Sequence, residues 1–168
     1  MTDDDRPQPP PAGDERATLG GFLDFLRATV VVKVAGLSDE QSRRPLLDSS
    51  PLMTPAGIVK HLTAVERWWF THALADDRSL PWLFDREDHD FEFRLTPQDT
   101  VEAVLHAYEQ ECERSRAVVA DMGLDDIGRR DKMVRSVRWV LTHMIEETAR
   151  HAGHLDLLRE SIDGVKGR

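Results

Sequence analysis

The chain has 168 residues and a formal net charge of −9, and an acidic surface argues against nucleic-acid and membrane-surface partners because it repels phosphate backbones and anionic lipids. No apolar run approaches the roughly 20 residues of a membrane span, and the single cysteine, Cys112, excludes an intrachain disulfide framework. The N-terminus also lacks the apolar stretch of a secretory signal, so we expect a cytoplasmic protein.

The first predicted elements are a tail and a helix. Residues 1–14 are polar and proline-rich, and we expect a disordered tail because such a segment buries too little apolar surface to offset its ordering entropy. A single domain is expected over residues 15–168. Its first helix is predicted over residues 15–34, where apolar residues recur at three- and four-residue steps. Gly36 is expected to end it in a left-handed conformation.

The second helix has the clearest start signal in the chain. Thr54 can cap it, and Pro55 fits the first helical position, where its missing N–H costs nothing. The helix is predicted to continue to about residue 75. Its apolar face is expected to carry Ile58, Leu62, Val65 and Trp69.

Two connections and two further helices complete the expected fold. Residues 38–53 should form a loop or a short helical turn. Residues 76–95 form a long connection that is rich in aromatic and acidic residues, and such loops within compact domains are often functional. The third helix is predicted over residues 96–121 and the fourth over residues 136–161. We therefore predict an all-α four-helix bundle with a long connection between helices 2 and 3.

The fourth helix places ionisable groups on its predicted inward face. Glu147 and His151 are four residues apart and project together, and a buried carboxylate is costly unless it is paired or used. His61 lies beside the apolar stripe of the second helix and is predicted to face this pair. A histidine from one bundle helix and a Glu/His pair from another can hold a divalent metal ion. Zn²⁺ suits these donors best, and Ni²⁺, Fe²⁺ or Mn²⁺ are alternatives. A buried salt bridge between Glu147 and His151 is the other interpretation of the spacing.

Further residues near this cluster have structural as well as functional interpretations. His154 is expected to orient a metal ligand or to be a core histidine. His143 is expected to be a core histidine, with a ligand or a pocket wall as alternatives. Trp68 can line the mouth of a pocket or simply pack, and Arg150 can hold an anionic group or form an ion pair on the solvent face. Cys112 is expected to be a small core residue, not a nucleophile. Three other histidines are predicted to lie at the surface or in loops: His72, His89 and His106.

Two stretches of the chain resemble motifs of the DinB/YfiT-like superfamily. Residues 54–62, TPAGIVKHL, resemble its second-helix entry, and residues 142–154, THMIEETARHAGH, resemble its last-helix signature. The resemblance covers nearly the whole chain beyond the proline-rich tail. It implies a four-helix bundle in which His61, Glu147 and His151 hold one divalent metal ion. Many members have histidine in both last-helix positions, and a carboxylate at the first resembles the mycothiol-dependent maleylpyruvate isomerase branch.

The same resemblance implies a function. It suggests a metal-dependent S-transferase or related detoxifying enzyme that joins a low-molecular-weight thiol to a small electrophile, and it includes members that form homodimers. The chain has 18 Arg, four Lys and no Asn. Scarcity of residues with A/T-rich codons points to a GC-rich genome, as in actinobacteria, and therefore to mycothiol instead of bacillithiol. Two alternatives stay open: a metal-dependent hydrolase that uses bound water, and a non-catalytic metal-binding or stress-response module.

Overall fold

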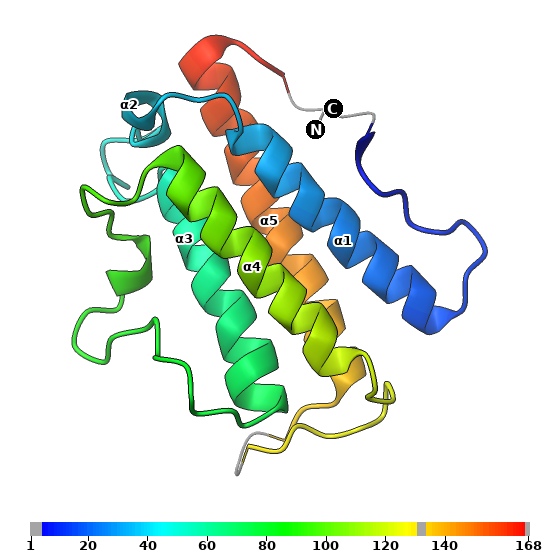
Figure 1. Ribbon diagram of the computed structural model, residues 1–168. Helices are drawn as coiled ribbons and strands as arrows, with labels where there is room; N and C mark the ends of the chain where they lie inside the picture. Colours follow the sequence, from blue (N-terminus) through cyan, green and yellow to red (C-terminus); the bar gives the residue numbers. More distant parts are fainter. Residues whose placement is uncertain (1–4, 131–133, 167–168) are drawn as a thin grey trace.

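Four long helices lie side by side in the computed structural model of the protein (Figure 1). The structure describes residues 5–130 and 134–166. The long helices are α1 (Glu15–Val34), α3 (Pro55–Glu66) with its continuation η2 (Arg67–Leu74), α4 (Val101–Val119) and α5 (Val137–Asp163). Two short elements lie between them, α2 (Asp39–Ser42) and the 3₁₀ turn η3 (Phe91–Phe93). Within the described residues the only extended pairing is an isolated bridge, which confirms the predicted all-α class.

Local sequence signals set the ends of most helices. The side chains of Thr54 and Ser136 each accept a hydrogen bond from a backbone N–H three residues further on, at the starts of α3 and α5. Pro55 occupies the first position of α3, as predicted. Gly36 and Gly164 follow α1 and α5 with φ values of 81° and 80°. Only glycine adopts this left-handed conformation without strain, so both positions end their helices.

The start of α4 differs from the prediction. The helix begins at Val101 with Thr100 as its cap, and not at residues 96–97. The Asp99 carboxylate accepts hydrogen bonds from the backbone N–H and the hydroxyl of Thr96, and another from the side chain of Lys60. These bonds hold the residues before α4 in a separate turn, because a short acidic side chain competes with the helix for the backbone N–H groups.

The second long helix changes its winding after Glu66. Residues Arg67–Leu74 form a π-helix, in which hydrogen bonds link residues five apart and each turn takes up an extra residue. The buried face therefore passes from Val65 to Phe70, which is fully buried. Trp69, which α-helical spacing predicted to be inward, lies half-buried at the edge of the core. The π-helix thus turns the two tryptophans that follow Arg67 toward the rim of the bundle.

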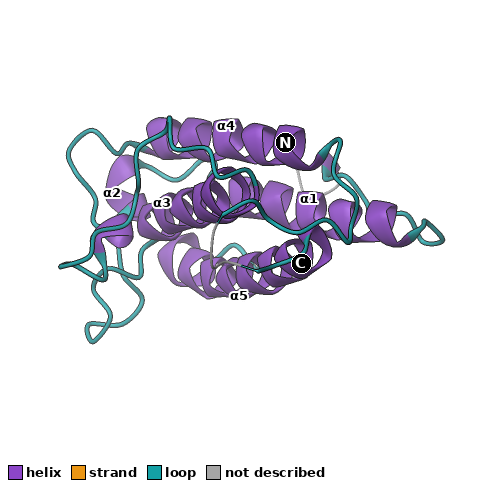
Figure 2. Cartoon of the chain, turned by 90° about the horizontal axis from the view of Figure 1, so that it is seen from below, coloured by secondary structure: helices purple, strands orange, loops and turns teal. Residues whose placement is uncertain are grey.

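The four long helices pack as two pairs. The most extensive contacts join α1 to α5 and α3 to α4, and α3 also packs against α5, so that α3 lies between α4 and α5 (Figure 2). Two clusters of buried apolar residues, one toward each end of the bundle, fill the interior. No helix among residues 5–130 and 134–166 has the length and hydropathy needed to cross a bilayer.

A buried ion pair joins α1 to the point where the π-helix begins. The Arg27 guanidinium donates to both carboxylate oxygens of Glu66, over 2.8 and 2.6 Å. Their side chains are only 6% and 1% exposed. Burial alone would lower the pKa of Arg27, but the charge and hydrogen bonds of Glu66 outweigh it and the net effect raises the pKa. Arg27 therefore stays charged inside the bundle.

Residues 5–14 lie against α1. Arg6 donates to the hydroxyl of Thr29 and sits 4.7 Å from the centre of the Phe25 ring. Pro9 and Pro10 pack where any side chain on Gly21 would collide with them. The predicted disorder of residues 1–14 and the single-domain boundary at residue 15 stay predictions, and residues 1–4 and 167–168 lie outside the described residues.

Candidate metal centre

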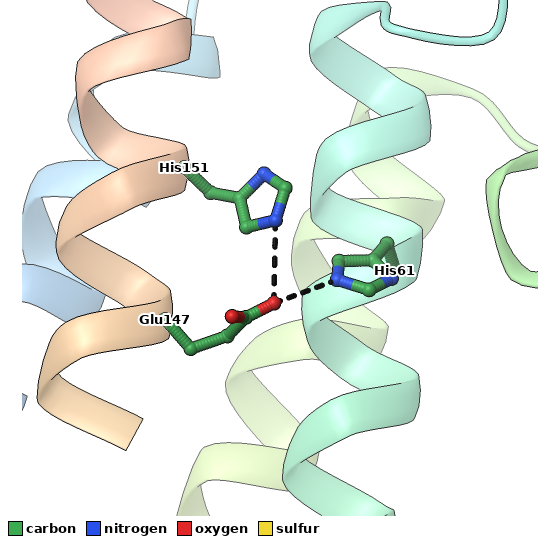
Figure 3. Close-up of side chains that lie close together, drawn as sticks. All are labelled: His61, Glu147 and His151. Carbon is green, nitrogen blue, oxygen red and sulfur yellow. Dashed lines mark hydrogen bonds and ion pairs between the residues drawn. The ribbon is translucent and has the colours of Figure 1, made fainter. Parts of the chain in front are cut away.

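Two helices bring the three predicted ligands together. His61 projects from α3, and Glu147 and His151 project toward it from successive turns of α5 (Figure 3). Glu147 Oε1 lies 3.1 Å from His61 Nε2 and 3.3 Å from His151 Nε2. One potential ligand atom from each residue lies within 4.8 Å of the other two. The three side chains therefore meet across the bundle, as their positions on the helices predicted.

The cluster is shielded from solvent and its carboxylate is ionised. The side chains of His61, Glu147 and His151 are 12%, 13% and 8% exposed. Hydrogen bonds from His151 and His61 hold the pKa of the Glu147 carboxyl well below its ordinary range, despite partial burial. A negative oxygen thus faces two imidazole nitrogens, and the other oxygen of Glu147 lies 3.3 Å from the Arg150 guanidinium.

This donor set fits a divalent cation. Two imidazole nitrogens and one carboxylate oxygen suit Zn²⁺ and its neighbours in the first transition row. Three protein ligands leave coordination positions for water or for a substrate atom. An isolated salt bridge between Glu147 and His151 needs no third group, whereas the structure supplies His61 from another helix to the same oxygen. The three residues therefore form a group that could hold a metal ion.

Two residues of the long connection, Glu92 and Phe93, contact the imidazole of His61. The 3₁₀ turn η3 places the carboxylate of Glu92 3.5 Å from His61 Nδ1. The ring of Phe93 stacks on the same imidazole, with 4.2 Å between centroids and 11° between planes. His61 Nδ1 is buried without a hydrogen bond from the described residues, and Glu92 is the acceptor placed near it. A carboxylate behind a ligating histidine fixes which ring nitrogen carries the proton.

Sequence reasoning missed Glu92 and Phe93. It noted residues 76–95 only as a long loop rich in acidic and aromatic residues. A loop has no periodicity that relates its side chains to a helix face, so no pattern links this turn to His61. The adjacent acid and aromatic residue just before α4 were the only available signal.

The other candidates surround the three ligands at different distances. His154 Nδ1 lies 3.5 Å from His151 Nδ1, and burial together with His151 lowers the pKa of His154. Arg150 is exposed and pairs with Glu146 as well as Glu147. His143 is half-buried and stacks on Trp139, which fits a pocket wall better than a core histidine.

Two of the three remaining histidines lie at the surface, as predicted. His89 and His106 are exposed, as expected. The surface or loop assignment of His72 is wrong, because this residue is 2% exposed. Its Nδ1 lies 2.8 Å from the carbonyl oxygen of Asp77, and its ring stacks on Trp82. The assignment rests on His72 fitting no convergent pattern of ligands, although it lies seven residues after Val65 and α-helical spacing places both on the same face.

An aromatic cavity opens beside the cluster. It is an open depression of about 430 Å³ formed by residues of the π-helix, the long connection and α5. Its lining residues are Val65, Trp68, Trp69, Trp82, Phe84, His143 and Glu147. Glu147 belongs both to this lining and to the ligand cluster, so the cavity borders the candidate metal centre.

Cys112 lies in the core and not at this site. It is 3% exposed among apolar residues of α4 and its neighbours. Burial, reinforced by the charge of Glu66, raises the pKa of its thiol. We expect the native protein to resist a thiol-specific reagent such as DTNB, and the urea-unfolded chain to react completely, because the thiolate is the reactive form. Rapid labelling of the folded protein would show that Cys112 is accessible.

Comparison with known proteins adds one finding. A family model described as Mycothiol-S-transferase matches residues 18–164. The matched region contains all of α3, α4 and α5, and with them the three residues of the cluster. Neither a curated protein nor a solved structure matches the chain.

Proposed function

Since the chain belongs to the mycothiol-S-transferase family, a DinB/YfiT-like family, we propose that it is a metal-dependent enzyme that joins mycothiol to a small electrophile. The observation that carries the proposal is the convergence of His61, Glu147 and His151 on one point beside a cavity. We also propose that the protein works in the cytoplasm and as a homodimer.

The three residues of the cluster would hold the ion. A Zn²⁺ ion bound there supplies a Lewis acid that lowers the pKa of a thiol and so provides thiolate at neutral pH. Glu147 contributes the negative charge that a cation needs, and its low pKa keeps that charge available. Glu92 lies behind Nδ1 of the His61 imidazole and Phe93 stacks on its ring, an arrangement that would leave Nε2 to bind the ion.

The reaction needs two substrates side by side. The thiol loses its proton to solvent, its sulfur forms a bond to the electrophilic carbon, and the displaced group leaves with its electron pair. The aromatic cavity would hold the electrophile, because one of its walls is Glu147 itself. The chain's own residues then act by orientation: α3 and α5 fix the sulfur, and the cavity fixes the carbon.

A direct assay tests this function. Protein freed of metal and reloaded with Zn²⁺, Ni²⁺, Fe²⁺ or Mn²⁺ is incubated with mycothiol and a panel of electrophiles. We expect conjugate to form faster than in the reaction without protein, and only with metal present. Ester or amide cleavage without any thiol would instead favour the hydrolase. A bound metal with neither activity would favour the non-catalytic module.

A substitution at Glu92 tests the metal centre without changing any of its three ligands. Glu92→Gln keeps the size of the side chain but removes the charge behind His61 Nδ1. We expect metal affinity to fall by about 10- to 100-fold, because the orienting partner of a ligating histidine is weakened. Titration with a competing chelator measures this. Asp90→Asn, an exposed change in the same loop, is the matched control, and an equal loss there would mean that the effect is not specific to His61.

A further inference from the structure

We propose that the cavity beside the metal centre selects planar, uncharged aromatic electrophiles. The inference rests on the proposed function and adds the chemical class of its second substrate. It depends on what lines the cavity, which charges lie near it, and where it ends. Each of these points to the same class of molecule.

Aromatic side chains make up most of the cavity wall. The rings of Trp68 and Trp82 lie 5.0 Å apart between centroids. Trp69 meets the ring of His143 at 4.9 Å, nearly edge-on. Phe84, on the long connection, also lines the cavity. Flat rings in offset and edge-on arrangements attract one another beyond the simple burial of apolar area, so such walls favour a flat ring over an aliphatic group of equal size.

The walls themselves are held by contacts outside the cavity. Trp82 stacks on the buried ring of His72, with 11° between planes. Trp69 packs on Trp139 at 5.1 Å between centroids. The π-helix supplies Trp68 and Trp69 as neighbours in sequence that both reach the cavity. A pre-formed aromatic surface loses little freedom on binding, which favours a rigid ligand.

Charges around the cavity disfavour an anionic ligand. Among the lining residues that the structure describes there is no lysine or arginine, and Glu147 is the one carboxylate. Two guanidinium groups beside the cavity already contact carboxylates. Arg130 lies over the rings of Trp68 and Trp82 and 3.9 Å from the Asp76 carboxylate, and Arg150 contacts Glu147.

The shape of the cavity matches a small molecule. Its volume of about 430 Å³ falls in the range of ligand pockets, and it ends at a side chain of the metal centre. A ring bound against the tryptophans would thus present a reactive carbon beside that centre. Trp82 is 48% exposed, so a second copy of the chain is the rival occupant, and the experiment must separate the two.

The experiment uses three electrophiles that share one reactive group. These are the N-benzyl, N-(cyclohexylmethyl) and N-(4-carboxybenzyl) chloroacetamides, in which chloride leaves as the thiol sulfur attacks the same carbon. With metal-loaded protein and mycothiol, we expect kcat/KM for the benzyl compound to exceed that for the cyclohexylmethyl compound by about tenfold. The carboxybenzyl compound should be the poorest of the three. Equal values for the first two would overturn the proposal.

Variants of Trp82 connect the preference to the cavity. Trp82→Ala should reduce the ratio of benzyl to cyclohexylmethyl kcat/KM several-fold, mainly through KM, and Trp82→Phe should restore most of it. Phe22→Ala removes another exposed aromatic, on α1 and outside the cavity, and should leave the ratio unchanged. An unchanged ratio in Trp82→Ala would show that the preference arises elsewhere.

If Trp82→Ala converts a dimer to monomers in sedimentation velocity, the cavity belongs to a subunit interface and the proposal is wrong.

A binding measurement separates this proposal from the proposed function. The unreactive analogue N-benzylacetamide should bind without thiol and show saturation-transfer NMR signals from its ring protons. These signals should weaken in Trp82→Ala. Binding without any transfer would leave the cavity's preference intact and remove the S-transferase function. Transfer to all three chloroacetamides at similar rates, without ring signals, would support the S-transferase function and overturn the proposed preference of the cavity.

Discussion

Replacing His151 by Ala is expected to abolish stoichiometric binding of a divalent ion and to return S-transfer to the uncatalysed rate. His151 supplies one of three donors that meet at the Glu147 carboxylate. Two donors on different helices cannot hold an ion with the affinity of three, and we expect the loss to exceed about 100-fold, the upper end for a merely orienting partner. Metal content by inductively coupled plasma mass spectrometry and the conjugation rate are the two measurements.

A second histidine provides the matched control for this change. His106 is exposed on α4, where it contacts Gln110 and no residue of the cluster. His106→Ala should retain one ion per chain and the full rate. Circular dichroism should show the same helix content in both variants, because neither residue supplies apolar core. Full metal occupancy in the His151 variant would show that the ligand assignment is mistaken.

Replacing Arg27 by Met is expected to be the most destabilising single change outside the metal centre. It leaves the Glu66 carboxylate, whose side chain is 1% exposed, without its cationic partner. Breaking a buried pair in this way costs about 3–5 kcal/mol, because an uncompensated charge remains in the interior. Thermal unfolding should show a midpoint lower by roughly 10 °C.

The double variant decides whether the cost comes from the orphaned charge. Arg27→Met combined with Glu66→Met removes both charges and should recover most of the lost stability. Arg94→Gln breaks an exposed pair with Asp88 and should change the midpoint little. If the double variant is as unstable as the single one, packing and not charge accounts for the effect.

The long helices and their caps could be predicted because the responsible signals are local. Thr54-Pro55 and Ser136 identify two helix starts, and Gly36 identifies an end, through hydrogen bonds and dihedral angles within a few residues. The cluster could be predicted for a related reason. Glu147 and His151 share a face by helical period alone, and only the placement of His61 required a guess about packing.

The errors come from local departures from the regular pattern. The spacing that predicted an inward Trp69 assumes 3.6 residues per turn, and the π-helix breaks that assumption from Arg67 onward. Thr96-Pro97 carries the same letters as the start of α3, but the hydrogen bonds of Asp99 make it a separate turn. The partners of His61 from the long connection have no sequence period at all, so tertiary structure alone reveals them.

The position of the cluster between helix pairs has a mechanical consequence. The most extensive contacts join α1 to α5 and α3 to α4, and the ligands come from both pairs, His61 from α3 and the other two from α5. A cation bound there would link the α1–α5 pair to the α3–α4 pair. Ligand binding to the native state alone adds to its stability, so loading would suppress the separation of the two pairs more than the fraying of either pair.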